Sequence, residues 1–576
     1  LPEYRIYMDF EAIRESKCDT LWHDAQGRPT KELKALCAGL HKIFPTCSAA
    51  DFLQNLEEGY ASEKNGKHSR AWPVWKQRIT YMQYVEIKKL PIFKLRQGLS
   101  GFYANKLMIR NRPYGPMAAS IVGAAYKETG KAYSGIELAY DTVLAGTPGI
   151  KHRRKVLNKF INISDTAAID GEDIVTTIDV SIQDLAERAL KKELIKDNAY
   201  TGVAIVMEVE TGDIKAMVNL DRDTTGVYHE GRNHAIADLL EPGSVFKTAS
   251  IITALEDGFI PDTANCIVDT GCGILEMHGA KMRDHNWHNG GYGKINVSRI
   301  LQVSSNIGVS VLIDKFYGKN PEKFVEGIHR LGLATDLKLP FNEYKAPRIR
   351  FPKKDKTGRY WSNWSKTALP WMSIGYETQV PPISTLTLYN AIANGGKMVK
   401  PRFVTRVERD GEVIREYPVE VIKEQICHKY ALETIQDILF KVVHEGLGKT
   451  AGSRAFNVSG KTGTAQKAHN GSYKSGIVDY LLSFCGYFPS EKPKYSCIVC
   501  IQKSGLPASG GQMSGKVFHD IAEGIMAKNI RYLIGKLGSA DISTIGDGTV
   551  TGSIAQINSN LTETIRISRF YTDLVN

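Results

Sequence analysis

The 576-residue sequence contains no long hydrophobic run and no compositional extreme. Because a membrane-spanning helix needs about 20 consecutive apolar residues, none is predicted in this chain. Hydrophobic residues make up 42% of the chain and charged residues 24%, which are ordinary proportions for globular proteins. These proportions exclude a disordered chain, a collagen and a coiled-coil rod. At about 100–200 residues per domain, roughly two to four domains fit.

Several widespread catalytic signatures are absent as well. Neither H-E-x-x-H nor G-x-S-x-G occurs, so the sequence gives no sign of a zinc protease of that type or of an α/β-hydrolase elbow. Gly-Lys-Thr occurs at 448–450 and 460–462, but neither triplet has the upstream glycine of a P-loop. A nucleotide triphosphatase of the P-loop type is therefore disfavoured.

The nine cysteines are scattered and odd in number, so no disulfide framework is predicted. Cys497 and Cys500 form a C-x-x-C pair, but residues 495–501 have the pattern of a buried strand, and neither a redox nor a metal role is expected. The net charge is +12, and the longest basic block is the run at 151–155. This balance gives little support to nucleic-acid binding and leaves an anionic membrane surface or an anionic substrate open.

The chain divides by pattern into three parts. Residues 1–165 are mixed and polar, contain no chemical motif and end in a basic segment. Residues 166–537 combine helices with antiparallel hairpins, which predicts the α+β class. Residues 538–576 are rich in Gly, Ser, Thr and Asn, and we interpret them as a linker or a truncated C-terminal segment. The chain starts at Leu1 instead of a methionine, so we expect that an upstream signal or anchor segment has been removed.

Periodicity and capping signals predict individual elements. Helices are expected at 31–44 and 49–60, the second capped by Ser48, and extended structure is expected at 78–93. In the second part, Asp179 is expected to cap a helix. Further strands are predicted at 174–178, 202–209, 214–218, 478–487 and 495–502, and further helices at about 244–255, 430–444 and 516–527.

The first candidate for chemistry is Ser244-Val-Phe-Lys247, the single Ser-x-x-Lys in the chain. The preceding Glu241-Pro-Gly243 is typical of a helix start, and positions i and i+3 share a helix face, so the Lys247 amine can reach the Ser244 hydroxyl. Serine becomes a nucleophile when a base removes its proton, and lysine can be that base when its pKa is lowered by burial or nearby cations. Alone, the pattern also fits a surface Ser and Lys on an amphipathic helix.

Two further patterns accompany it. Ser304-Ser305-Asn306 is the single Ser-x-Asn, and a hydroxyl and an amide at this spacing can point into one cleft, although such residues are also common in turns. Lys-Thr-Gly occurs at 356–358, in a basic polar loop that we treat as unrelated, and again within 461–464. Strand alternation places Lys461 and Gly463 on one face, and a glycine in a strand often marks the close approach of a ligand.

In the order Ser-x-x-Lys, Ser-x-Asn, Lys-Thr-Gly, the three patterns form a set typical of penicillin-binding proteins and serine β-lactamases. The chain resembles the class B, monofunctional penicillin-binding protein transpeptidases over about residues 100–535. The resemblance implies an α+β transpeptidase fold, an antiparallel sheet between helical layers, preceded by an elongated N-terminal pedestal domain of the dimerisation type. Similar landmarks outside the three motifs are Arg112-Pro-Tyr-Gly-Pro116, Gly146-Thr-Pro-Gly149, Thr177-Ile-Asp179 and Ala393-Asn-Gly-Gly396.

The resemblance also implies a role for each motif residue. Ser244 would attack the penultimate D-Ala carbonyl of a peptidoglycan stem peptide, with Lys247 as the general base. Ser304 would relay a proton toward the leaving nitrogen, and Asn306 would hold Lys247 and the substrate amide. Lys461 would add positive potential that keeps Lys247 deprotonated.

The Lys-Thr-Gly-Thr strand is implied to bind the substrate. The hydroxyls of Thr462 and Thr464, which flank Gly463, would hold the substrate carboxylate, and the backbone N–H groups of Ser244 and Thr464 would form the oxyanion hole. β-Lactams would acylate the same serine. The resemblance implies neither a cofactor nor a metal, and we expect His285-Asn-Trp-His288 to be a polar loop rather than a zinc site.

Within class B, residues 471–473 and 483–489 look more like the FtsI-like division type than the elongation type. The implied partners are stem peptides, β-lactams and membrane proteins of the division complex, including a glycosyltransferase, with no nucleic acid. The implied location is the periplasmic side of the bacterial inner membrane, with a single N-terminal anchor upstream of Leu1.

Two other functions are compatible with the motifs. A serine β-lactamase would hydrolyse the acyl-enzyme with an activated water, but such enzymes are small and lack the large N-terminal region. A scaffold would keep the fold and work only by binding division proteins, which the three intact motifs argue against. Substituting Ser244 distinguishes a scaffold from an enzyme.

Overall fold

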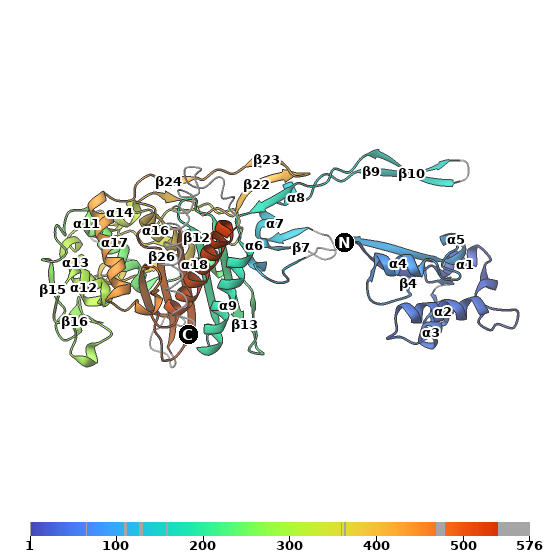
Figure 1. The fold of residues 1–576 in the computed structure, drawn as a ribbon, viewed down its shortest axis with the longest axis horizontal. Helices are drawn as coiled ribbons and strands as arrows, with labels where there is room; N and C mark the ends of the chain where they lie inside the picture. The colour runs from blue at the N-terminus through green and yellow to red at the C-terminus, as the bar shows by residue number, and fades with distance from the viewer. Residues whose placement is uncertain are drawn as a thin grey trace, which may run out of the picture. The chain divides into compact units, whose positions relative to one another are not determined.

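The computed structural model describes residues 2–538, apart from residues 65, 109–111, 126–130, 157–158, 359, 362–363 and 468–477. The chain forms two compact units, Leu1–Gly115 and Pro116–Asn576 (Figure 1). Residues 471–473 and the segment from 539 onward, both used in the sequence interpretation, lie outside the described residues. Within the described ranges, no helix is both long and apolar enough to cross a membrane.

The first unit is built on a small antiparallel sheet with its own core. Strand β1 (Pro2–Met8) pairs along its length with β6 (Phe102–Met108) and at its two ends with the short strands β4 and β5. Trp22, Leu36 and Phe52 are fully or almost fully buried beside it. The other elements of this unit are α1 (Phe10–Glu15), α2 (Lys31–Ile43), α3 (Ala49–Ala61), β2 (Glu63–Lys64), β3 (Lys67–His68), β4 (Trp72–Pro73), β5 (Ile79–Thr80), α4 (Tyr81–Ile87) and α5 (Gln97–Ser100).

Helices α2 and α3 confirm two predictions, and Ser48 caps α3 as expected. The predicted extended structure at 78–93 is wrong, because only Ile79–Thr80 is a strand and a helix follows at once. The side chain of Thr80 accepts from the Gln83 N–H, while the Gln83 side chain accepts from the Thr80 N–H. This reciprocal cap stabilises a helix start in a segment whose residue pattern favours a strand.

A six-stranded antiparallel sheet organises the second unit, in the order β14-β13-β12-β27-β26-β25. The central neighbours β12 and β27 come from opposite ends of the unit, and β25 is an edge strand. The strands predicted at 202–209, 214–218, 478–487 and 495–502 are confirmed as four members of this sheet. The bounds are β12 (Thr201–Glu208), β13 (Ile214–Arg222), β14 (Tyr228–Glu230), β25 (Ser459–Lys467), β26 (Asp479–Phe488) and β27 (Tyr495–Ser504).

Helices cover both faces of this sheet, each over a separate apolar core. On one face lie α9 (Val180–Lys196), capped by Asp179 as predicted, and α18 (Ser514–Gly538), side by side in Figure 1. The other face packs against α16 (Pro382–Ala393) and α17 (Lys429–His444), and α11 (Lys247–Glu256) and α13 (Asn306–Tyr317) belong to the same apolar core. Alternate residues of β12 enter the two cores, Val203 and Ile205 one, Ala204 and Val206 the other. The predicted antiparallel sheet between helical layers is confirmed.

The same alternation of side chains places the two cysteines of the C-x-x-C pair on opposite faces of the sheet. Cys497 is buried in the core beneath α9 and α18, whereas Cys500 is buried in the core on the opposite face of the sheet. Burial raises the pKa of the Cys500 thiol to about 12. The two sulfurs therefore cannot share a disulfide or a metal ion, and the segment is the buried strand that the sequence predicts.

The remaining elements connect and cover this framework. The predicted helix at 430–444 is confirmed, the predicted strand at 174–178 is shorter than expected, and the basic segment near 150–165 is a hairpin of β9 and β10. Their bounds are α6 (Ala119–Val122), β7 (Ala124–Ala125), β8 (Ala132–Ser134), α7 (Gly135–Ala139), α8 (Asp141–Leu144), β9 (Ile150–Val156), β10 (Lys159–Thr166), β11 (Asp173–Thr176), α10 (His234–Ala237), α11 (Lys247–Glu256), β15 (Ile267–Asp269), β16 (Ile274–Met277), β17 (Ala280–Arg283), β18 (Lys294–Asn296), α12 (Val297–Gln302), α13 (Asn306–Tyr317), α14 (Pro321–Arg330), β19 (Arg348–Ile349), α15 (Ala368–Ser373), β20 (Thr378–Gln379), α16 (Pro382–Ala393), β21 (Met398–Val399), β22 (Val404–Arg409), β23 (Glu412–Glu416), β24 (Val421–Lys423) and α17 (Lys429–His444).

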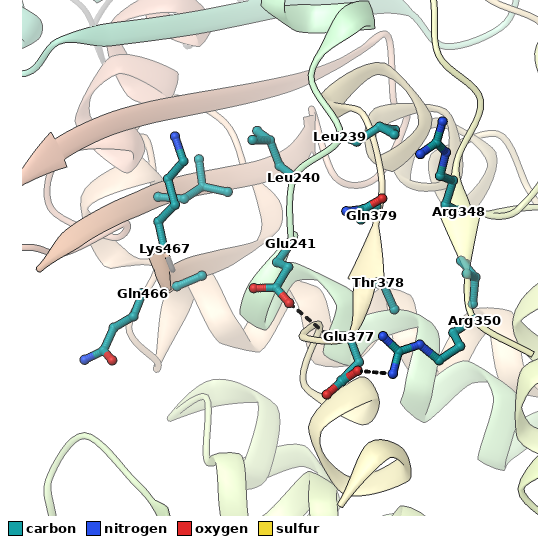
Figure 2. A pocket seen from close by; sticks show the side chains of 13 residues that line it. Leu239, Leu240, Glu241, Arg348, Arg350, Glu377, Thr378, Gln379, Gln466 and Lys467 are labelled. Carbon is teal, nitrogen blue, oxygen red and sulfur yellow. Dashed lines mark hydrogen bonds and ion pairs between the residues drawn. The ribbon is translucent and has the colours of Figure 1, made fainter. Parts of the chain in front are cut away.

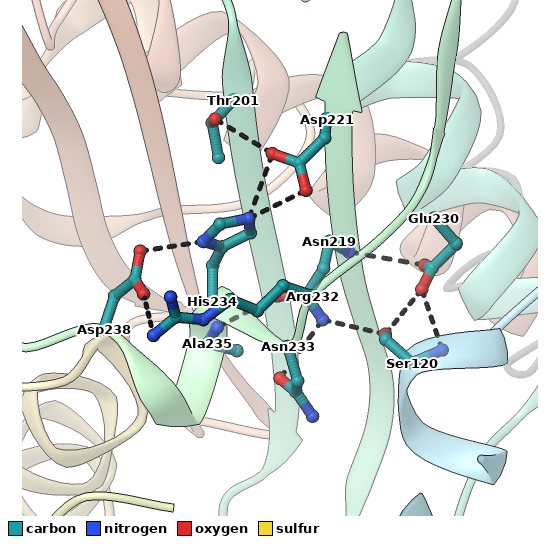
Figure 3. A network of polar contacts seen from close by, with 10 residues as sticks. All are labelled: Ser120, Thr201, Asn219, Asp221, Glu230, Arg232, Asn233, His234, Ala235 and Asp238. Atoms are coloured by element: carbon teal, nitrogen blue, oxygen red, sulfur yellow. Dashed lines mark hydrogen bonds and ion pairs between the residues drawn. The ribbon is translucent and has the colours of Figure 1, made fainter. Parts of the chain in front are cut away.

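A buried polar network attaches α6 to the far edge of the sheet (Figure 3). Glu230 of β14 accepts from the backbone N–H and the hydroxyl of Ser120, and burial raises the pKa of Glu230 to about 7. Next to it, the His234 ring lies between the carboxylates of Asp221 and Asp238. Burial lowers the pKa of His234, but these two hydrogen bonds outweigh it and raise the value to about 9.

Candidate active site

The Ser-x-x-Lys pattern lies at the junction of two helix types. A single α-helix was expected from residue 244, but Gly243–Phe246 is a 3-10 turn and α11 begins at Lys247. The turn is pressed onto β25, because a Cβ added at Gly243 would lie 2.8 Å from Cβ of Ala465. Gly243 also has φ +59°, which glycine adopts without strain. This turn holds Ser244 beside the edge strand, and no described residue hydrogen-bonds its hydroxyl.

Lys247 is completely buried and is held by the second motif. Its Nζ donates to the backbone carbonyl of Ser304 and to Oδ1 of Asn306, at 2.7 Å each, and lies 3.3 Å from Ser304 Oγ. Burial lowers the pKa of Lys247 from 10.5 to about 7, although the nearby charge of Asp284 raises it. An amine with such a pKa is poised to exchange protons near neutral pH.

Lys461, also completely buried, approaches the same serine from β25. Its Nζ donates to Ser304 Oγ and to the backbone carbonyl of Thr462, at 2.9 Å each. Burial lowers the pKa of Lys461 well below its usual value, and the charge of Lys247 lowers it further. The Ser304 hydroxyl therefore lies between two amines, neither of which is held strongly in its charged form.

Asp284 positions the second motif, a function that no sequence pattern indicated. This buried carboxylate follows β17 and accepts from the backbone N–H groups of Asn306 and Ile307, at 2.6 and 3.0 Å, and from the Ser305 hydroxyl at 2.7 Å. It thereby caps α13 and fixes the loop that carries Ser304, which has φ +53°. Such a backbone angle persists in a non-glycine residue only where the surroundings enforce it.

The loop between β27 and α18 contacts the Lys-Thr-Gly-Thr segment and fixes its position. Thr464 Oγ1 accepts from the Gly510 N–H at 3.0 Å, which leaves its own O–H free to donate. A Cβ added at Gly510 would lie 1.9 Å from the Gly463 carbonyl oxygen, and one added at Gly463 would lie 2.2 Å from Ser483 Oγ. Close backbone packing therefore requires the glycine at 510, whereas a Cβ at 463 would meet the Ser483 side chain. Thr462 is buried, with Oγ1 3.4 Å from the Lys461 amine.

The structure thus gathers Lys247, Ser304, Asn306 and Lys461 into one hydrogen-bonded cluster, and it places the Ser244 turn against the strand of Thr462–Thr464. The second Lys-Thr-Gly, at 356–358, lies in an exposed loop apart from this cluster. His278 bonds Asp314 and His285 bonds Tyr292, so the two histidines have separate partners. In the described part of the chain, no group of three or more His, Cys, Asp or Glu could hold a metal ion.

Comparisons with known proteins give the family. Residues 202–523 match the penicillin binding protein transpeptidase domain, and residues 3–176 match the penicillin-binding protein dimerisation domain. The chain is 28% identical over 449 residues to the peptidoglycan D,D-transpeptidase FtsI of Buchnera aphidicola, which covers 76% of this chain and 71% of that protein. It is also 26% identical over 409 residues to the probable peptidoglycan D,D-transpeptidase PenA of Neisseria flavescens. That alignment covers 69% of this chain and 94% of the Neisseria protein.

Among solved structures, a peptidoglycan synthetase from Bifidobacterium adolescentis superposes with a TM-score of 0.63 over 92% of both chains, at 18% identity. This similarity supports the fold alone. The transpeptidase match covers more than half of the sequence and contains all three motifs, and a dimerisation domain precedes it. The chain therefore belongs to the class B penicillin-binding protein transpeptidases.

Proposed function

We propose that this protein is a peptidoglycan D,D-transpeptidase that cross-links stem peptides through an acyl-enzyme on Ser244. The observation that carries the proposal is the position of the Ser304 hydroxyl, 3.3 Å from the amine of Lys247 and 2.9 Å from the amine of Lys461. This arrangement connects a general base to a second amine through one hydroxyl, beside the turn that holds the nucleophile.

Contacts and charge together assign the protons of the two lysines. Lys247 Nζ has oxygens at 2.7, 2.7 and 3.3 Å, and Lys461 Nζ has oxygens at 2.9, 2.9 and 3.4 Å, so the number of contacts does not distinguish them. The two short contacts of Lys247 are to oxygens that only accept, so a neutral amine makes both and keeps a lone pair. Burial disfavours the charge on both lysines, but a substrate carboxylate held by Thr462 and Thr464 favours the ammonium form of the adjacent Lys461. We therefore assign the base to Lys247 and the positive charge of the substrate complex to Lys461.

These assignments support an acylation step at Ser244. The Lys247 amine removes the proton of Ser244, whose Oγ attacks the penultimate D-Ala carbonyl. The N–H groups of Ser244 and Thr464 stabilise the oxyanion, and loss of one such donor typically costs about 10²–10³ in rate. The amide bond breaks, the leaving nitrogen receives its proton through Ser304, and D-Ala departs. An amine of a second stem peptide then attacks the ester and gives a proton to Lys247. The ester bond to Ser244 breaks, Lys247 returns the proton to the Ser244 oxygen, and the new amide bond is the cross-link.

The strand beyond Lys461 binds the substrate in this scheme. The free O–H of Thr464, the hydroxyl of Thr462 and the Lys461 ammonium hold the terminal carboxylate. Asn306 uses one N–H on the Arg283 carbonyl at 2.8 Å, and its second N–H is left for the substrate amide. β-Lactams meet the same groups, because they present a carboxylate and a reactive carbonyl in one compact molecule.

We also propose a division role at the outer face of the bacterial cytoplasmic membrane, with division-complex membrane proteins, including a glycosyltransferase, as partners. The relatives named FtsI support this role. The proposed division into a pedestal at 1–165 and a transpeptidase domain at 166–537 is supported by the matched ranges 3–176 and 202–523.

The test is intact-protein mass spectrometry after incubation with benzylpenicillin, with Ser244→Ala as the matched variant. We expect a stable adduct of one penicillin mass on the parent protein and none on the variant. Rapid conversion of penicillin to penicilloic acid would instead indicate a β-lactamase. An unmodified parent protein would contradict the proposal and favour a scaffold.

A further inference from the structure

A charged cavity continues the active-site strand past Thr464 (Figure 2). It has a volume of about 570 Å³. One wall is the end of β25, and the facing walls are the segment just before the Ser244 turn and the two short paired strands β19 and β20. We call this cavity the side-chain subsite; it is lined by Leu239–Glu241, Arg348–Arg350, Glu377–Gln379, Ala465–Lys467 and Leu481.

The position of the subsite fits a donor peptide laid along β25. An extended peptide that adds to an edge strand advances by about 3.3 Å per residue. With its carboxylate at Thr462 and Thr464, the peptide can continue only along the accessible end of the strand, because residues 459–463 are buried whereas Gln466 and Lys467 are exposed. The residue that precedes the two terminal D-Ala residues therefore reaches the subsite.

Part of the wall is fixed in place by its own contacts. Glu241 Oε1 accepts from the backbone N–H of Glu377 at 3.0 Å, and Glu377 Oε2 pairs with Arg350 Nη1 at 2.6 Å. Glu377 has φ +60°, a strained angle for a non-glycine residue. The two carboxylates of the wall are thereby held at the end of the subsite nearest to Ser244.

Unlike Arg350, which pairs with Glu377, Arg348 presents at the wall a cation that is unpaired among the described residues. It belongs to β19, where it pairs with Gln379 of β20, and its side chain is exposed at the wall. Among the described residues, the Arg348 guanidinium has no ion-pair or hydrogen-bond partner, and Figure 2 places it apart from the Glu377–Arg350 pair. An arginine in such a position matches a carboxylate, which it can bind through two parallel N–H groups.

We propose that the side-chain subsite binds the third residue of the donor stem peptide, and that this residue is a diamino-dicarboxylic acid. Arg348 binds the carboxylate at the end of its side chain, and Glu241 and Glu377 face the ammonium beside it. This inference rests on the proposed transpeptidase function and adds the substrate class. A lysine at the third position would place its ammonium near the carboxylates of the wall but leave Arg348 without a partner.

The test measures how well stem pentapeptides slow acylation of the protein by benzylpenicillin, so it does not depend on turnover. Three peptides differ only at the third residue, which is meso-diaminopimelic acid, its side-chain amide or L-lysine. We expect the acid to halve the acylation rate at a concentration about tenfold or more below that of the other two, the usual effect of one hydrogen bond to a charged group. Rates are normalised to each protein without peptide.

Variants identify the residue responsible. Arg348→Ala should abolish the difference between the three peptides, and Arg348→Glu should reverse it in favour of lysine. Arg415→Ala is the matched control, an exposed arginine on β23, and should keep the parent's preference. Equal effects of the three peptides on the parent, or a preference that survives in Arg348→Ala, would overturn the inference and leave the acylation chemistry standing. A parent that penicillin does not acylate would overturn the proposed function and this inference with it.

Discussion

Two buried lysines around one serine hydroxyl are the central feature at the scale of single residues. An ammonium moved from water to an apolar interior loses much of its solvation, so the neutral form gains population. Lys247 and Lys461 also share Ser304, so their protonation is coupled and a titration reports the pair. The protein thereby obtains a base that works near neutral pH from a side chain whose usual pKa is 10.5.

The first prediction concerns the pH dependence of acylation. Since the pKa of Lys247 is about 7 and its neutral amine is the proposed base, the rate of acylation by benzylpenicillin should rise with pH and level off above about pH 8. At pH 6 it should be about tenfold below the plateau, because about a tenth of the amine is then neutral. Stopped-flow or quenched mass spectrometry measures the rate, and a flat profile from pH 6 to 8.5 would contradict the assignment.

The Lys247→Arg variant tests the same assignment by removing the base. A guanidinium cannot lose its proton in this range, so acylation should fall by about 10²–10⁴-fold. Lys441→Arg, at a half-buried lysine paired with Asp437, serves as the control and should match the parent. An arginine variant that is acylated at the parent's rate would exclude Lys247 as the base.

The sequence predicts which side chains the structure brings together, but not the group that supports them. Each motif is a short run whose spacing places two functional groups together, so local geometry is enough to propose Ser244, Lys247 and Asn306. Asp284 has no such signal, because its hydrogen bonds go mostly to backbone N–H groups, which every residue carries. Its function is visible only after the chain has folded.

At the scale of elements, the helix α13 depends on a carboxylate from outside the helix. The first N–H groups of a helix have no partner within it, and Asp284 accepts two of them while it also holds the Ser305 hydroxyl. The hairpin of β16 and β17 thus fixes the start of α13, and with it the loop that contacts Lys247.

Two substitutions of Asp284 should separate the effect of its charge on Lys247 from its effect as a cap of helix α13. Asp284→Asn keeps the acceptor oxygen but removes the charge that raises the pKa of Lys247, so the midpoint of the acylation profile should move below pH 7. Asp284→Ala leaves buried donors unpaired and should lower the free energy of unfolding by about 3 kcal/mol. Chemical denaturation and the pH profile are the two measurements.

The control for this experiment is Asp262→Ala, which removes an exposed carboxylate that caps a loop, and its effect on unfolding should be much smaller. If Asp284→Asn kept the parent's midpoint, the charge of Asp284 would have no influence on the base. If Asp284→Ala were as stable as the Asp262 variant, the cap would not support α13.

The sequence predicted helices and strands correctly where a regular hydrophobic pattern extends over many residues. It failed where a few local contacts determine the backbone conformation. The four long strands of the sheet were predicted within one or two residues at most ends. The helix α4 was missed because the reciprocal bonds of Thr80 and Gln83 outweigh the alternation of the segment. The 3-10 turn at Ser244 was missed because it depends on packing against Ala465, more than 200 positions later.

At the scale of the whole molecule, the chain has separate apolar cores in its two units. The core of the first unit contains residues 4–102, while the two cores around the large sheet contain residues from 118 onward. All residues of the candidate site belong to the second unit. A unit with its own buried core is able to fold by itself.

A shortened chain of residues 116–576 should therefore fold and be acylated by benzylpenicillin within about twofold of the full chain, because every contact to the reacting groups is retained. Intact mass spectrometry measures the rate, and the same chain with Ser244→Ala is the control. A shortened chain that stays soluble and monomeric but is not acylated would mean that the first unit is needed to assemble the site.

The two middle strands of the central sheet are far apart in the chain. Thr201 of β12 pairs with Gln502 of β27, some 300 positions later, and β25 joins the sheet only through β26 and β27. Contacts between such distant segments form slowly and late. The chain thus carries its proposed nucleophile without the amine of Lys461 or the proposed second donor of the oxyanion hole until β25, β26 and β27 have paired, and a β-lactam has no assembled target before the sheet is complete.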